Sequence, residues 1–201
     1  MTLNLPDFDP NRLAAIIYRP EDDVDTLLAD FAGDLLQAGE RIGGVVQRNT
    51  KDGTGKLTGM QLVDLMTGRE IGIFQSLGAG SSACKLDVSG LAEATRAVTN
   101  AIADGVSLIV VNKFSKQEAS GGGLRSELAD AVVAGRAVLI AVPEKCIDAW
   151  REFTGDRGTT LLCARHVVEE WWREVSLRRA GARTATAGLS EPISRSSRLT
   201  I

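Results

Sequence analysis

The chain has 201 residues, of which 44% are hydrophobic and 24% charged, and its formal net charge is −3. This size and balance predict one globular domain and exclude a coiled coil, a collagen or a wholly disordered chain. The slight acidity provides no basic field for nucleic acid, and no apolar run approaches the roughly 18 residues of a membrane span.

The first residues show no basic segment followed by an apolar one, so no secretory signal is expected. Cys84, Cys146 and Cys163 are widely spaced and form no CxxC pair, which argues against a disulfide framework or a structural zinc site. His166 is the single histidine, so histidine-based metal or catalytic sets are not expected. Free thiols and the absence of a leader together predict a cytoplasmic protein.

The first half of the chain predicts a β-α-β unit followed by a hairpin. Residues 13–18 form a continuous apolar run, which is typical of a strand covered on both faces. Residues 22–38 carry apolar side chains at helical spacing, and residues 41–47 return as a second strand. The polar, glycine-containing segment 48–59 is predicted to be a loop, and residues 60–75 a hairpin.

The second half alternates helices and strands, beginning with a helix at 88–103 and a strand at 107–111 that is apolar enough for the centre of a sheet. The alternation predicts an α/β three-layer sandwich around a mainly parallel sheet, plus the hairpin. Residues 12–178 would form this single domain, after an N-terminal extension (1–11) and before a flexible basic tail (179–201). The remaining predicted elements alternate helix and strand at 123–134, 137–142, 147–153, 159–162 and 164–178.

The loop after the first strand, residues 19–25, stands where a GxxxxGK[ST] motif would cradle phosphates in a nucleotide-binding fold. It has no glycine and no lysine but four acidic residues, which repel phosphate. The segment 53–56 resembles the end of that motif, but Thr50 replaces its first glycine and Leu57 cannot ligate magnesium. A conventional P-loop nucleoside triphosphatase is therefore not expected.

The loop over residues 78–87 has the composition of an anion-binding turn. Small residues let the main chain approach a ligand, serine hydroxyls donate, and a lysine adds charge just before a helix N-terminus. The alternative is an exposed turn in which Asp87 simply caps the helix. The candidate ligand-binding residues here are Gly80, Ser81, Ser82 and Lys85.

The loop over residues 112–125 follows the predicted central strand and concentrates charged and glycine residues. Its two cations could grip an anion, its asparagine could orient that anion, and its glutamate could bind a cation or act as a base. The alternative is a surface loop whose charges are merely solvated. The candidate residues are Asn112, Lys113, Glu118, Gly121, Gly122 and Arg125.

Together these two loops resemble an uncharacterised bacterial domain family that is related to nucleoside triphosphatases and often encoded beside molybdate-transport genes. The resemblance covers roughly residues 12–165. It implies a P-loop-NTPase-like fold without a Walker A loop, a cytoplasmic setting and a link to molybdenum or tungsten handling. The segments that carry it are IVVNKF (109–114), QEA (117–119), GGGLR (121–125), ACKLD (83–87) and GLA (90–92).

The leading functional hypothesis is a non-catalytic binder of a small oxyanion such as molybdate or tungstate, which requires both loops to meet at one edge of the sheet. The second is a divergent nucleotide-binding enzyme. In that case Asp22, Asp23 or Glu118 would hold Mg²⁺, while Lys113 and Arg125 would contact phosphate.

The third hypothesis is a regulatory module that binds another protein through the hairpin or the Trp171-Trp172 pair. Adjacent side chains on a helix point about 100° apart, so one tryptophan could pack inward while the other meets a partner. Burial of the pair against the protein's own sheet is the favoured alternative. This hypothesis also leaves a homo-oligomer open.

Overall fold

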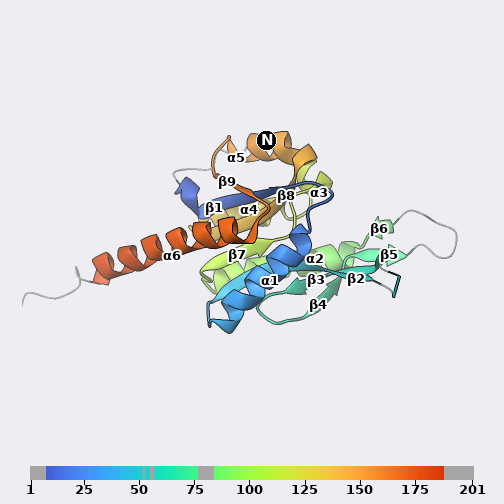
Figure 1. Ribbon diagram of the computed structural model, residues 1–201, viewed down its shortest axis with the longest axis horizontal. Helices are drawn as coiled ribbons and strands as arrows, with labels where there is room; N and C mark the ends of the chain where they lie inside the picture. Colours follow the sequence, from blue (N-terminus) through green and yellow to red (C-terminus); the bar gives the residue numbers. More distant parts are fainter. Residues whose placement is uncertain (1–7, 52, 55–56, 77–83, 188–201) are drawn as a thin grey trace, which may run out of the picture.

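The computed structural model describes residues 8–51, 53–54, 57–76 and 84–187 (Figure 1). It is a three-layer α/β sandwich around a seven-stranded sheet, which confirms the predicted fold class. Five neighbouring strands run parallel to one another. At one edge of the sheet two further strands follow, and each pairs antiparallel with the strand before it. Across the sheet the order is β4 (Glu70–Gly72), β3 (Leu57–Asp64), β2 (Ile42–Lys51), β7 (Leu108–Val111), β8 (Ala137–Pro143), β1 (Leu13–Tyr18) and β9 (Thr159–Leu162).

Helices cover both faces of the sheet, and none in the described ranges is long and apolar enough to cross a membrane. Leu108 and Val110 of β7 face the layer of α1 and α6, whereas Ile109 and Val111 face α2, α4 and α5. All four side chains are fully buried, as the continuous apolar run predicted. The helices are α1 (Val24–Gln37), α2 (Val88–Ala103), α3 (Lys116–Ala119), α4 (Arg125–Val133), α5 (Ile147–Thr154) and α6 (Arg165–Ala187), with 3-10 turns η1 (Pro10–Arg12) and η2 (Glu144–Cys146).

The loop predicted at residues 48–59 is wrong in large part, because β2 and β3 continue through it as an antiparallel pair. Arg48 pairs with Gln61, and Asn49 pairs with Met60. Residues 48–50 are exposed, so this part of the ladder needs no apolar alternation and gives no strand signal in the sequence.

The predicted hairpin at 60–75 is present as β3 and β4, but its second strand is short. The chain leaves the sheet after Gly72 and enters β5 (Phe74–Ser76). This strand pairs with β6 (Cys84–Leu86) in a separate two-stranded sheet.

The last helix is longer than predicted, since α6 runs to Ala187 and residues 179–187 are helical rather than a flexible tail. Alanine and arginine both favour helix, and the second half of α6 projects away from the sandwich (Figure 1). Trp171 and Trp172 are each only 6% exposed, which agrees with the favoured expectation that the pair is buried within the protein's own fold. Both lie in the layer shared with α1, and Trp171 Nε1 donates to the Asn11 carbonyl at 2.8 Å.

Candidate functional site

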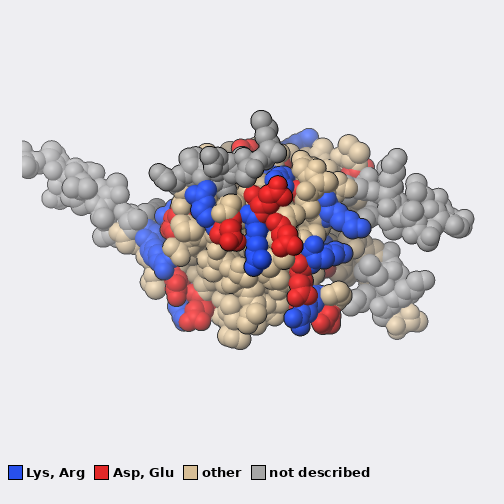
Figure 2. Space-filling model, turned by 90° about the horizontal axis from the view of Figure 1, so that it is seen from above, with Lys and Arg blue, Asp and Glu red and all other residues tan. Residues whose placement is uncertain are grey.

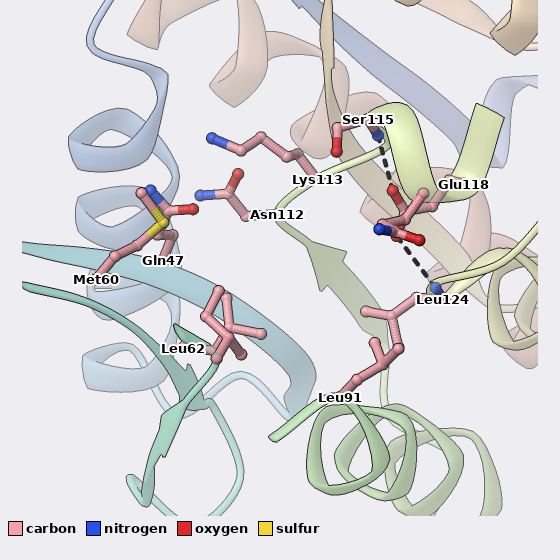
Figure 3. A pocket seen from close by; sticks show the side chains of 11 residues that line it. Gln47, Met60, Leu62, Leu91, Asn112, Lys113, Ser115, Glu118 and Leu124 are labelled. Atoms are coloured by element: carbon pink, nitrogen blue, oxygen red, sulfur yellow. Dashed lines mark hydrogen bonds between the residues drawn. The ribbon is translucent and has the colours of Figure 1, made fainter. Parts of the chain in front are cut away.

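A cavity of about 390 Å³ lies at the carboxyl ends of β2 and β7, the place where open α/β sheets bind ligands (Figure 3). Its volume falls in the range of small-molecule sites. One wall is polar and the other apolar, and we call it the β7 cavity. The polar wall is Gln47, Asn112, Lys113, Ser115, Gln117 and Glu118, and the apolar wall is Met60, Leu62, Ile73, Leu91 and Leu124.

The main chain after β7 is anchored on both sides, which fixes the side chains at the mouth of the cavity. The Asn112 N–H donates to the Val45 carbonyl of β2, and the Phe114 N–H donates to the Ala141 carbonyl of β8. The Asn112-Lys113 peptide bond is cis, and the Phe114 side chain is fully buried. The two main-chain hydrogen bonds thus tie the segment of Asn112 and Lys113 to β2 and β8, the strands on either side of β7.

Glu118 closes the loop between β7 and α4. Glu118 is buried, with 6% of the residue exposed, and its carboxylate accepts the Ser115 N–H at 2.8 Å and the Leu124 N–H at 3.1 Å (Figure 3). Gly123 has a φ of +60°, and a Cβ there would lie 2.0 Å from Glu118 Oε1. Each carboxylate oxygen thus accepts a main-chain hydrogen bond, so Glu118 stabilises the loop in addition to lining the cavity.

The other candidates of this loop lie outside the cavity. Arg125 stacks 4.4 Å from the centre of the Phe153 ring and donates to the Glu118 carbonyl at 3.0 Å. Gly121 and Gly122 form the turn between α3 and α4, where Gly121 has a φ of +93°. In the part of the chain that the structure describes, none of these three residues lines the β7 cavity.

The structure reveals a polar cluster around Asp25, in the first turn of α1, that the sequence analysis missed. Asp25 accepts hydrogen bonds of 2.8 Å from the side-chain amides of Gln47, Asn49 and Asn112. Lys113 Nζ lies 3.7 Å from Asp25 Oδ1, so its charge is paired. The available signal was the run of polar residues Gln47, Arg48 and Asn49 directly after the apolar part of the strand.

Tyr18 borders this cluster at the end of β1. Its ring centre lies 5.8 Å from Lys113 Nζ. Burial first, and then the negative charge of Asp25, raise the pKa of Tyr18 to about 12. The hydroxyl is therefore neutral at physiological pH.

The predicted contact between the loops at residues 78–87 and 112–125 lies only partly within the described residues. Ile73 and Leu91, which flank the β5–β6 pair in the chain, line the cavity together with residues 112–124. Lys85 lies in β6, and Asp87 caps α2 by accepting the Ser89 N–H at 3.0 Å. Gly80, Ser81 and Ser82 lie outside the described residues.

The loop between β1 and α1 contains no phosphate cradle, as the sequence predicted. The Arg19 N–H donates to the Asp22 carboxylate, and the Thr26 N–H donates to the Asp23 carboxylate. The chain's own acidic side chains thus occupy these main-chain donors. The glycine-rich segment 53–56 falls in the β2–β3 connection, not between a strand and a helix.

Charge on the surface is mixed. Figure 2 shows acidic and basic side chains interleaved on the face seen from above the view of Figure 1. Among the described residues that line the β7 cavity, Lys113 is the one cation. Selection of an anion at this site would therefore depend on local contacts and not on a positive electrostatic field over the whole surface.

This fold and site define a three-layer α/β domain with a cavity of ligand size beside its central strand, and its first strand-to-helix loop has neither glycine nor lysine. The chain belongs to the family described as "Protein of unknown function (DUF2478)", whose model matches residues 13–171.

One relative is the Molybdenum import ATP-binding protein ModC 2 of Bradyrhizobium diazoefficiens, which is 66% identical over 178 residues. These residues are 89% of this chain but 20% of that protein, so the chain spans about one fifth of its length. The solution structure of a human cancer-related nucleoside triphosphatase matches with a TM-score of 0.51 and 16% identity. The match covers 75% of this chain and 88% of the human one, and it shows the fold alone.

Proposed function

We propose that this chain is a cytoplasmic ligand-binding domain linked to molybdate import, and that its β7 cavity binds a tetrahedral oxyanion such as molybdate or tungstate. The observation that carries the proposal is the position of Lys113 at the end of β7, on the polar wall of a cavity of ligand size. The relative that is 66% identical is named a molybdenum import ATP-binding protein, which supports the connection to molybdenum. A domain that binds the imported ion could report its level to the import machinery.

The polar wall offers the groups that an oxyanion needs. Ser115 and Gln117 add neutral donors beside the Lys113 ammonium. The Lys113–Asp25 distance of 3.7 Å is longer than a hydrogen bond, so the ammonium can turn toward a ligand at small cost. The candidate residues Gly80, Ser81, Ser82 and Lys85, from the segment before α2, belong to the same proposal.

Hydrolysis of a nucleotide is the weaker alternative, because the loop before α1 gives its donors to Asp22 and Asp23. Its support is the fold shared with a nucleoside triphosphatase. The two functions predict different ligands, and one titration separates them.

The test is calorimetric titration and thermal unfolding of the whole chain with molybdate, tungstate, sulfate, phosphate and ATP with Mg²⁺. We expect molybdate and tungstate to bind. An anion at one hundred times its Kd would stabilise the fold by about 2.7 kcal/mol, and so raise Tm by roughly 5–11 °C.

Lys113→Met should abolish this shift, whereas Lys116→Met, which removes the same charge outside the cavity, should leave it unchanged. Binding of none of the four oxyanions would refute the proposal. Binding of ATP with Mg²⁺ alone would support the nucleotide function instead.

A further inference from the structure

Four side chains direct hydrogen-bond donors at one point at the end of the sheet. Gln47 and Asn49 come from β2, and Asn112 and Lys113 follow β7. We call these four residues the amide–lysine cluster. Their common target is the Asp25 carboxylate.

The cluster is preorganised. Gln47 and Asn112 are 3% and 4% exposed. The three hydrogen bonds from side-chain amides to Asp25 are all 2.8 Å, the length of charge-assisted hydrogen bonds. Gln47 Nε2 also donates to Asn49 Oδ1 at 2.9 Å, which fixes the orientation of both amides. Converging amide donors with one cation form a site for a small anion, and in this structure that anion is a side chain of the protein itself.

Asp25 has space to leave the cluster. Its side chain is 16% exposed and lines a second cavity of about 320 Å³ beside α1, which we call the α1 cavity. Gln47 lines both cavities, so a ligand in the β7 cavity would lie next to the side-chain amides that donate hydrogen bonds to Asp25.

Charge decides from which side an anion would enter. Among the residues that the structure describes, Asp23, Asp25 and Asp30 line the α1 cavity together with one cation, Arg48. In the β7 cavity the charged lining residues that the structure describes are Lys113 and Glu118, and main-chain N–H groups already bind the Glu118 carboxylate. Entry from the β7 cavity therefore meets less repulsion.

We infer that the amide–lysine cluster is the oxyanion site itself and that Asp25 is its resident occupant, which a tetrahedral oxyanion replaces when Asp25 turns into the α1 cavity. This inference rests on the proposed function and assigns it to particular donors. Displacement of Asp25 weakens the apparent affinity of the natural chain, because the site is free only in the fraction of molecules in which Asp25 has turned away.

The decisive experiment is titration of Asp25→Ala with molybdate and with sulfate, next to the natural chain. We expect the variant to bind about tenfold more tightly or better, because its donors are no longer occupied. The matched control is Asp30→Ala, which removes a nearby acidic charge that also lines the α1 cavity. It should change the affinity by about twofold or less, since only a screened charge is lost.

A second substitution locates the bound anion. Asn49 lines the α1 cavity and bonds Asp25, but it does not line the β7 cavity as described. In the Asp25→Ala background, Asn49→Ala should weaken binding about fivefold or more, since one donor to the anion is lost. An anion that sits in the β7 cavity alone would not respond to this change.

The outcomes distinguish failure of the inference from failure of the proposed function. If the natural chain binds molybdate and Asp25→Ala binds it no more tightly, the inference is wrong and the proposed function stands. If only the variant binds, the four donors accept an anion but no oxyanion replaces Asp25 in the natural chain, so the displacement and the proposed function are both wrong. If neither binds, the cluster is not an anion site and both are wrong.

Should Asp25→Ala fail to fold, NMR of the natural chain during molybdate titration gives the same decision. The side-chain NH₂ signals of Gln47, Asn49 and Asn112 should shift together. Shifts confined to Ser115 and Gln117 would overturn the inference.

Discussion

Glu118 and Asp25 are both carboxylates at the end of the sheet, and each accepts several hydrogen bonds. Glu118, predicted as a cation ligand or base, binds main-chain N–H groups at both ends of its own loop. Asp25, predicted to repel phosphate, instead collects amide donors from two other strand ends. The role of a carboxylate thus depends on which donors the fold brings within about 3 Å of it.

We predict that Glu118→Ala lowers the free energy of unfolding by about 3 kcal/mol, because the Ser115 and Leu124 N–H groups lose a charged acceptor. Glu118→Gln, which keeps one acceptor oxygen, should lose about half as much. Gln117→Ala is the control, with a change below about 0.5 kcal/mol at this exposed neighbour. Urea unfolding measures all three, and a Glu118→Ala variant as stable as the control would contradict the structural role.

At the scale of single elements, two helical glycines lie in opposite surroundings. A Cβ on Gly90 of α2 would lie 1.9 Å from the Gly72 carbonyl of β4, so α2 packs directly against the main chain of the sheet edge. A Cβ on Gly33 of α1 would have no neighbour within 4 Å. Helix propensity alone favours alanine equally at both positions.

The pair Gly33→Ala and Gly90→Ala therefore separates propensity from packing. Gly33→Ala should stabilise the fold by about 1 kcal/mol, since it gains helix propensity without a clash. Gly90→Ala should destabilise it by about 3 kcal/mol, because α2 must move away from β4. Chemical unfolding gives both values, and equal effects at the two sites would mean that α2 does not pack as described.

At the scale of the whole molecule, α6 is docked over its first half and then leaves the body of the protein (Figure 1). Val175 is 2% exposed in the core beside α1, whereas Leu177 is 66% exposed. The apolar core that the described residues form therefore ends on α6 at about Val175, although the helix itself continues to Ala187.

We expect Val175→Ala to lower the free energy of unfolding by about 2 kcal/mol, because it opens a cavity between α6 and α1. Leu177→Ala should change it by less than about 0.5 kcal/mol. Thermal and urea unfolding at several protein concentrations test the pair. A large, concentration-dependent loss for Leu177→Ala would reveal that a second copy covers this residue, and so would answer the question of a homo-oligomer.

Much of the architecture follows from local patterns. The runs at residues 13–18, 107–111 and 137–142 predict buried parallel strands, and the spacing at 88–103 predicts a helix, because each pattern reflects burial of that segment's own side chains. The same logic fails at residues 48–50, where the strand pairs with β3 while all three residues are exposed.

The sequence by itself determined the alternation of buried strands and helices, the absence of a phosphate loop after β1 and the presence of polar groups at the end of β7. These properties depend on residues close together in the chain. Only the tertiary structure decided that Asp25 meets Asn112 and Lys113, about 87 positions away, and that both Trp171 and Trp172 are buried. The physical reason is that hydrogen bonds and ion pairs act over a few ångströms of space, and the sheet order β2-β7-β8-β1, which brings those ends together, is not written in any local pattern.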